Sequence, residues 1–477
     1  MTDLVSKLSD EQRILAEVSL RAVCPDDGKY GKATGDLSGY LSAEAEWRSC
    51  VLIQRFLLET RAEFGKADPK YADEVAAAVP KISPLNISLL EEQVTRHDQL
   101  AVIEELGRFV SLEAKALLHP GTTSYDVLDT ARSFLLRGAW FDVVRPRIKQ
   151  VVGKLCSLAE EHMDVLQVGR THLQDTSPVP FGATLAGYAA RLAARIVNCD
   201  STFKGLLGKI SGIVGTGAPV GIVVGDALKF QARVLEKLGL KPDFTATQIV
   251  QKEPLADVGN SVVTLMYVLA NFAEDMRLLY SSAIGEVTSL DAQARLKGSS
   301  ADAGKNNPIN WENIAGKAAV VESGMRVLYE MMRTNFQRDL RNSVQARYQP
   351  GMMIAETYES FCRASKALDQ LFVRRDVVER NLRPVRDMPT EAMTAITRAH
   401  GYVGESVGHD VVAGFAKTAK KNGSRLIEIA LEDAHFKQFY DTELSDKERC
   451  ILNGELELYV GSSKDVARRN IEYARSI

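Results

Sequence analysis

The chain has 477 residues, more than one ordinary hydrophobic core supports, which predicts two or three domains. Hydrophobic residues make up 45% of it, charged residues 25%, and the formal net charge is only -3. This balance excludes a polycation that neutralises phosphates by bulk charge, so neither nucleic acid nor a membrane surface is an expected partner.

Cysteine usage and the first residues indicate the compartment. The six cysteines show no CxxC or other metal-ligand spacing, and their low density predicts reduced thiols. The N-terminal stretch MTDLVSKLSDEQR lacks the apolar run of a signal peptide. The most apolar window, residues 261–273, is too short to span a bilayer. We therefore expect a cytoplasmic protein.

Apolar residues recur at helical spacing along most of the chain. In residues 181–198, Leu185, Tyr188, Leu192 and Ile196 fall on one face, and residues 262–279 carry a similar stripe. The one convincing β-branched run is GIVVG, at residues 221–225. The pattern predicts an all-α fold.

Proline- and glycine-rich stretches separate the expected helices. They occur near residues 28 and 122, at 210–225 and 298–316, and near 385. Their spacing predicts three parts: an N-terminal helical domain, 1–125, a central bundle of long helices, 126–380, and a C-terminal helical domain, 381–477.

Three histidines lie in polar, loop-like settings. They are His97 in TRHDQ, His119 in LLHPGTTSYD and His172 in VGRTHLQDTSP. A lone histidine is more often a packed or surface residue than a catalytic one. Each of these, however, adjoins hydroxyl, amide or charged groups at an expected helix end, which makes all three candidate functional residues.

A metal site is the obvious alternative use for these histidines. The chain has no HExxH, HxH or CxxC spacing, and the run EEH at residues 160–162 is expected on a solvated helix face. We therefore expect no metal.

Residues 298–316, GSSADAGKNNPINWENIAG, place serines, a lysine and amides between two helical segments. Asn307 can cap the following helix and Pro308 can start it. A helix N-terminus together with Lys305 would stabilise an anion and could lower the pKa of a nearby serine. The residues alone leave an even choice between such a site and a plain connecting loop.

These motifs resemble a known family. GSSADAGKNNP is similar to the GSSxMPxKxNP signature of the fumarase, aspartase and argininosuccinate lyase superfamily. RTHLQ (170–174) resembles its RTHxQ segment, HPGTTSYD (119–126) its HxxxTSxD segment, and TRHD (95–98) its histidine-aspartate element. The similarity runs from CPDDGKYG (24–31) to about residue 380.

Three further motifs are similar to the adenylosuccinate lyase branch: CPDDGKYG, TATQI (245–249) and QRDLRNSVQAR (337–347). The resemblance implies an all-α fold whose long helix bundle assembles four chains into a homotetramer. It also implies active sites built from segments of three subunits.

The resemblance implies a β-elimination that releases fumarate from adenylosuccinate, a succinyl-nucleotide of purine biosynthesis, and from the aminoimidazole succinyl intermediate (SAICAR). Ser299 would be the base, with Lys305 and Asn307 stabilising the carboxylate that develops negative charge. His172 would be the general acid, with Glu312 as its orienting partner. No cofactor is needed, because side chains handle both protons.

The same carry-over assigns His97 to the catalytic group and the other matching positions to substrate binding. These positions are Lys29, Tyr30, Arg96, Asp98, His119, Thr123, Ser124, Thr171, Gln248, Ser300, Asn307, Arg338, Ser343 and Arg347.

Several positions depart from the family pattern. Asp302-Ala303 replaces the usual Met-Pro of the signature, and an aspartate there should repel a dianion by about 1 kcal/mol or more. Lys29 stands where arginine is usual, Tyr125 where a small or acidic residue is usual, and Arg341 adds a cation.

Two alternatives therefore stay open. One is a sister lyase that acts on another succinyl-amine or substituted succinate, such as argininosuccinate. The other is a non-enzymatic structural member, which would be expected to have lost the base or the acid. Ser299, His172, Lys305 and Glu312 are all present.

Overall fold

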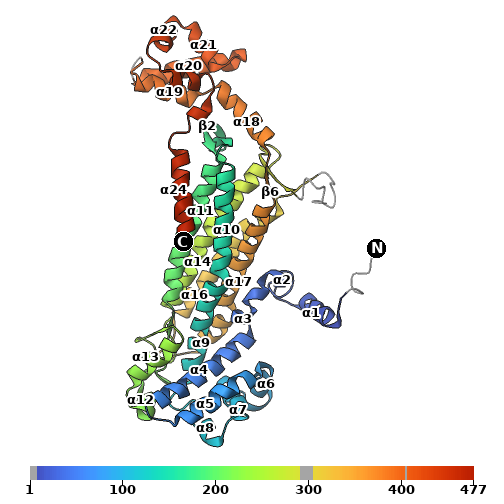
Figure 1. Cartoon of the computed structure of the whole chain (residues 1–477), viewed down its shortest axis with the longest axis vertical. Coiled ribbons are helices and arrows are strands. Elements are labelled where there is room, and N and C mark those ends of the chain that lie inside the picture. Colours follow the sequence, from blue (N-terminus) through green and yellow to red (C-terminus); the bar gives the residue numbers. More distant parts are fainter. Residues whose placement is uncertain (1–7, 291–304, 403–404) are drawn as a thin grey trace. The chain divides into compact units, whose positions relative to one another are not determined.

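A computed structural model describes residues 8–290, 305–402 and 405–477. These residues are mostly helical, which confirms the expected all-α class (Figure 1). The chain divides into two compact units. Unit 1 comprises Met1–Ile148, Arg195–Ala270 and Ile314–Arg363, and unit 2 comprises Lys149–Ala194, Asn271–Asn313 and Ala364–Ile477. The division at residues 125 and 380 stays a prediction.

Five long helices contain the boundaries between the units. They are α10 (Arg145–Glu161), α11 (Phe181–Lys204), α14 (Glu253–Tyr280), α16 (Ile309–Met331) and α17 (Arg341–Asp369). The stripes predicted at 181–198 and 262–279 belong to α11 and α14, so both helix predictions are confirmed.

Unit 1 adds shorter helices and one two-stranded parallel sheet, β3–β4. Its elements are α1 (Asp10–Arg21), α2 (Gly31–Thr34), α3 (Ser38–Leu41), α4 (Ala43–Glu63), α5 (Pro69–Ala78), α6 (Pro84–Leu90), α7 (Asp98–Gly107), α8 (Leu112–Ala116), α9 (Ser124–Gly138), β3 (Leu207–Gly208), α12 (Ala218–Val224), α13 (Ala227–Lys237) and β4 (Lys241–Pro242).

Unit 2 adds two antiparallel pairs, β1–β2 and β5–β6, and a group of C-terminal helices. Its elements are β1 (Leu166–Thr171), β2 (Gln174–Pro180), β5 (Val287–Ser289), β6 (Leu371–Val373), α18 (Arg375–Asp387), α19 (Thr390–Ala399), α20 (Glu405–Asn422), α21 (Leu426–Glu432), α22 (Ala434–Thr442), α23 (Asp446–Leu452) and α24 (Ser463–Ser476).

The core of unit 1 explains why its helices form where they do. Polar residues start them: the Ser42 side chain accepts a hydrogen bond from the backbone of Ala45 at the start of α4, and Asp68 caps α5. Their apolar faces then pack together, with Leu57 of α4, Val102 of α7 and Phe230 and Val234 of α13 in one buried cluster.

Unit 2 has two smaller clusters of its own. Helices α19 to α23 surround buried residues such as Met393 and Phe436. A second cluster packs Leu166 and Val168 of β1 against Leu382 of α18. The β1–β2 hairpin is therefore anchored by its base, while its turn carries the RTHLQ motif.

Two local predictions from sequence are wrong. The run GIVVG lies mostly in helix α12, because Pro219 in the first turn favours a helix start and Gly225, at φ 88°, ends it. Residues 160–162 are not all solvated: Glu160 and Glu161 are exposed, but His162 is only 6% exposed and its ring lies 5.9 Å from that of Phe181.

Helix α14 is long and apolar enough, by length and composition, to cross a membrane. However, 61% of its most apolar stretch is buried inside the protein, which is typical of a core helix.

Close packing at the start of α11 fixes the base of the hairpin. A Cβ added at Gly182 would lie 2.8 Å from the Met163 backbone and closer still to the carbonyl oxygen of Ala159. The Gly182 N–H donates to the carbonyl of His162 over 3.0 Å. Helix α10 and the first turn of α11 therefore approach through a position that admits only glycine.

We predict that Gly182→Ala destabilises the protein by about 1–3 kcal/mol, because backbone atoms must move to admit the methyl group. Urea unfolding followed by circular dichroism measures this. Gly187→Ala is the matched control on the same helix, since nothing lies within 4 Å of its added Cβ, and it should stabilise by about 0.5–1 kcal/mol. Equal effects of the two substitutions would contradict the prediction.

Candidate functional site

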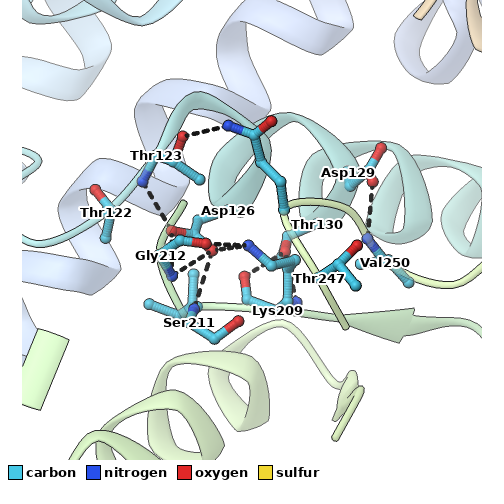
Figure 2. Close-up of polar contacts among 12 residues, drawn as sticks. Thr122, Thr123, Asp126, Asp129, Thr130, Lys209, Ser211, Gly212, Thr247 and Val250 are labelled. Atoms are coloured by element: carbon cyan, nitrogen blue, oxygen red, sulfur yellow. Dashed lines mark hydrogen bonds and ion pairs between the residues drawn. The ribbon is translucent and has the colours of Figure 1, made fainter. Parts of the chain in front are cut away.

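A buried ion pair organises the start of α9, where Thr123 and Ser124 lie. The carboxylate of Asp126 accepts the Thr123 N–H over 2.8 Å and those of Ser211 and Gly212 over 3.0 and 3.1 Å (Figure 2). The Lys209 ammonium group pairs with the same carboxylate, and both side chains are 0% exposed. Two stretches more than eighty residues apart in sequence are thereby locked together.

The half-buried Thr123 and Ser124 lie where backbone N–H groups and the positive end of α9 face away from the helix. A helix N-terminus with two hydroxyl groups suits an anionic carboxylate. The substrate-carboxylate role that the resemblance implies for both residues stays a prediction.

Gln248 and Arg338 join this group. The Gln248 amide donates to the Thr123 hydroxyl over 3.5 Å, and Arg338 donates to the Gln248 side-chain oxygen over 3.4 Å. The Arg338 guanidinium also lies 3.6 Å from the ring centroid of the buried Tyr125. Three predicted residues from three separate motifs therefore meet in one chain.

His119 is neutral in this environment. It adopts a left-handed conformation at φ 67°, and its Nδ1 lies 2.9 Å from the Gln54 amide nitrogen, which donates to it, so the proton sits on Nε2. Burial lowers the pKa of His119 to about 4, against the opposing charge of Asp126. It can therefore donate a hydrogen bond without carrying charge.

Asp98 and Arg347 line a cavity of about 460 Å³ in unit 1. Glu91 lies beside them, and burial, followed by the negative charge of Asp98, raises its pKa. Arg347 is exposed and Ser343, one turn earlier on α17, is half-buried. Residues four apart share a helix face, so Ser343 and Arg347 can hold one anion near the N-terminus of α17.

Arg96 and His97 lie next to Asp98. Arg96 has a left-handed backbone at φ 53°, and His97 caps α7 by accepting the Leu100 N–H at its Nδ1 over 3.5 Å. Both side chains are exposed.

The N-terminal pair lies elsewhere in unit 1. The Lys317 ammonium lies 4.3 Å from the ring centroid of Tyr30, and the Arg363 guanidinium lies 5.7 Å from it. Lys29 is exposed. Arg363 and Arg347 are sixteen residues apart on α17, about 24 Å along the helix axis. Tyr30 and Arg347 therefore do not meet within one chain.

His172 lies at the tip of the β1–β2 hairpin in unit 2. Thr171 pairs with Gln174, which leaves His172 and Leu173 as the two turn residues, with φ of 54° and 58°. Such a turn favours asparagine and glycine, so a histidine and a leucine there are strained. Thr171 and His172 are both exposed, as a group that acts on a substrate requires.

The C-terminal end of the signature motif is also in unit 2. Lys305 is exposed, Asn307 is half-buried, and α16 begins directly after Pro308, whose carbonyl accepts the Glu312 N–H over 3.0 Å. Within the described part of the chain, no hydrogen bond joins Glu312 to His172, so their pairing stays a prediction. Ser299 and Ser300 lie outside the described residues.

Sequence reasoning did not select Asp126 or Lys209. Asp126 is in the HPGTTSYD motif, and its spacing from Thr123 is that of a capping residue, which was a usable signal. Lys209 stands alone in an apolar, glycine-rich stretch, and an isolated charge in such a setting often has a buried partner. The described residues contain no group of three or more His, Cys, Asp or Glu side chains suited to a metal ion.

Comparison with known proteins identifies the family. The profile of a family described as Lyase matches residues 43–322. An adenylosuccinate lyase of Archaeoglobus fulgidus is 26% identical over 95% of this chain and 99% of its own length. One of Bacillus subtilis is 31% identical over 73% of this chain and 78% of its own length.

A solved structure shares the fold. The fumarate lyase of a Mesorhizobium species has a TM-score of 0.78 at 21% identity, with 92% of this chain and 97% of that chain covered. The superfamily resemblance is confirmed: the chain is a lyase and belongs to this lyase family, alongside the adenylosuccinate lyases it matches.

Proposed function

We propose that the protein cleaves adenylosuccinate, and also SAICAR, by β-elimination of fumarate in purine nucleotide biosynthesis in the cytoplasm. The meeting of Thr123, Gln248 and Arg338 at the start of α9 is the observation that carries this proposal. Relatives named adenylosuccinate lyase across nearly the whole chain support the choice of substrate.

In this reaction Thr123, Ser124 and Thr171 bind the succinyl carboxylates, and the neutral His119 donates a hydrogen bond from Nε2. Ser299 removes the proton from the carbon next to a carboxylate. Lys305, Asn307 and the positive end of α16 stabilise the charge that develops. His172 protonates the departing nitrogen.

The proposal includes a shared active site in a homotetramer. Lys29 and Tyr30 on one chain and Ser343 and Arg347 on another together bind the nucleotide phosphate, because Tyr30 and Arg347 are too far apart within a single chain to hold one group. The active site is then complete only in the assembled oligomer.

Asp302 favours one alternative, a sister lyase that acts on a different succinyl compound. A negative charge in the signature motif weakens the binding of a dianion. Such an enzyme releases fumarate from argininosuccinate or another succinyl-amine and leaves nucleotide substrates untouched.

Purified protein mixed with adenylosuccinate should release fumarate, detected by its ultraviolet absorbance, whereas argininosuccinate should stay intact. Ser299→Ala should lower kcat by about 10²–10⁴-fold, because the reaction loses its base. Ser201→Ala is the control, since Ser201 is an exposed residue in the last turn of α11. Normal turnover by the Ser299 variant would disprove the assignment of the base.

Complementation tests the shared site. Tyr30→Ala and Arg347→Ala should each weaken substrate binding about 10–100-fold, because each removes a partner of a charged group. Co-expression of the two variants should restore part of the activity, since some sites then draw both intact residues from different chains. No recovery in a mixed tetramer would contradict the shared site.

His119 predicts a pH dependence of stability. Its folded pKa of about 4 lies below the ordinary histidine value of 6.5, so between these values the unfolded state binds more protons. The wild type should therefore lose stability as pH falls from 6.5 to 4, and His119→Gln should lose about 3 kcal/mol less. Urea unfolding of both proteins at several pH values measures the difference; parallel curves would contradict it.

A further inference from the structure

Glu286 is a fully buried carboxylate that the reaction as described does not use. It directly precedes β5 in unit 2 and is 0% exposed. Its own backbone is fixed on both sides, because its N–H donates to Leu279 and its carbonyl accepts from Arg374, each over 2.9 Å. The position of its side chain is therefore set by the surrounding fold.

Three side chains donate to the Glu286 carboxylate. The Gln167 amide donates over 2.5 Å, the Arg170 guanidinium over 2.6 Å and the Asn381 amide over 2.9 Å. An ionised carboxylate without water is unfavourable unless paired and hydrogen-bonded, and this set satisfies both of its oxygens. Two of the three donors come from β1 and the third comes from α18.

Arg170 of β1 links Glu286 to the second strand of the hairpin. Besides Glu286, its guanidinium binds Asp175 of β2 over 3.1 Å, and its side chain is only 14% exposed. Arg170 and Asp175 are register partners, one pair below Thr171 and Gln174. The guanidinium of Arg170 therefore holds the two strands together one residue pair before the turn.

The turn needs such support because its geometry is strained. His172 and Leu173 both hold left-handed conformations that ordinary side chains adopt rarely. Below Arg170, the strands come so close that a Cβ at Gly169 would lie 2.6 Å from the Ser177 carbonyl oxygen. The register shifts there, between Val168 and Arg170, so the strand pairing alone does not fix the direction of the tip.

We propose that Glu286 is a positioning residue for His172. By holding Arg170 against the hairpin, it keeps the strained turn in the one conformation that presents the imidazole to the substrate. This inference rests on the proposed function, in which His172 is the general acid.

The substitution Glu286→Gln tests this proposal. It removes the negative charge that holds Arg170 and leaves the shape of the side chain almost unchanged. We expect kcat to fall about 10–100-fold, because a small displacement of a catalytic group has effects of that size, while KM changes by less than about threefold. Arg170→Gln should give the same result. The double variant should be no worse than either single one, since both residues act through one ion pair.

Glu160→Gln and Arg475→Gln are the matched controls. This carboxylate and guanidinium also form a two-bond pair in unit 2, at 2.7 and 2.6 Å, but both side chains are half exposed. Neither control should change kcat. Additive losses at Glu286 and Arg170, or a fall in kcat that merely follows the loss of folded protein, would overturn the inference.

A second measurement does not depend on turnover. With ring-labelled histidine, and with His172→Gln to assign the signal, the His172 resonance should be single and sharp in the wild type. In Glu286→Gln it should broaden or split as the turn samples other conformations. An unchanged resonance would overturn the inference. If the wild type released no fumarate, the proposed function would fail, and this spectrum would still decide the role of Glu286.

Discussion

The buried ion pair between Asp126 and Lys209 is the contact on which the candidate site in unit 1 depends. Removing one partner of such a pair leaves an uncompensated charge and is destabilising by about 3–5 kcal/mol. Asp126 also receives backbone donors from both stretches that it joins, so neither stretch can shift without breaking several bonds. The start of α9 is therefore rigid before any ligand arrives, and Thr123 presents its hydroxyl to Gln248 from a fixed position.

The same physical arrangement recurs at two other places, the hairpin that carries His172 and the surroundings of Tyr30. Glu286 and Arg170 fix the hairpin that carries His172. Lys317, itself 6% exposed, pairs with Glu356 and Glu359 of α17 and lies against the ring of Tyr30. Loops alone would leave these motifs free to move, since loop backbone is poorly restrained. A few buried ion pairs give these motifs a defined geometry, because a buried charge is stable only next to a suitable partner.

The helices could be predicted from the sequence, but the buried ion pairs could not. The stripes of α11 and α14 follow from apolar spacing alone, and so did the all-α class. The hairpin at 166–180 was missed because its outer half, RTHLQDTSP, carries too few apolar residues to show an alternating pattern. GIVVG was assigned wrongly because a short apolar run does not distinguish a strand from a buried helix. Lys209 and Asp126 are 83 residues apart, and nothing local to either residue names its partner.

The structure shows what two residues that depart from the family motifs, Tyr125 and Arg341, contact. Tyr125 replaces a small or acidic residue, and its ring supports the guanidinium of Arg338 at the place where Arg338 contacts Gln248. An aromatic face attracts a cation and orients its plane, so this substitution holds Arg338, a predicted substrate-binding residue, in place. Arg341, the added cation, has an ion-pair partner close to it in sequence. Its guanidinium is bound to Asp339 over 2.6 Å, so its charge is already balanced. Under the proposed function, the phosphate-binding charge on α17 is that of Arg347, and Lys29 contributes from the N-terminal segment.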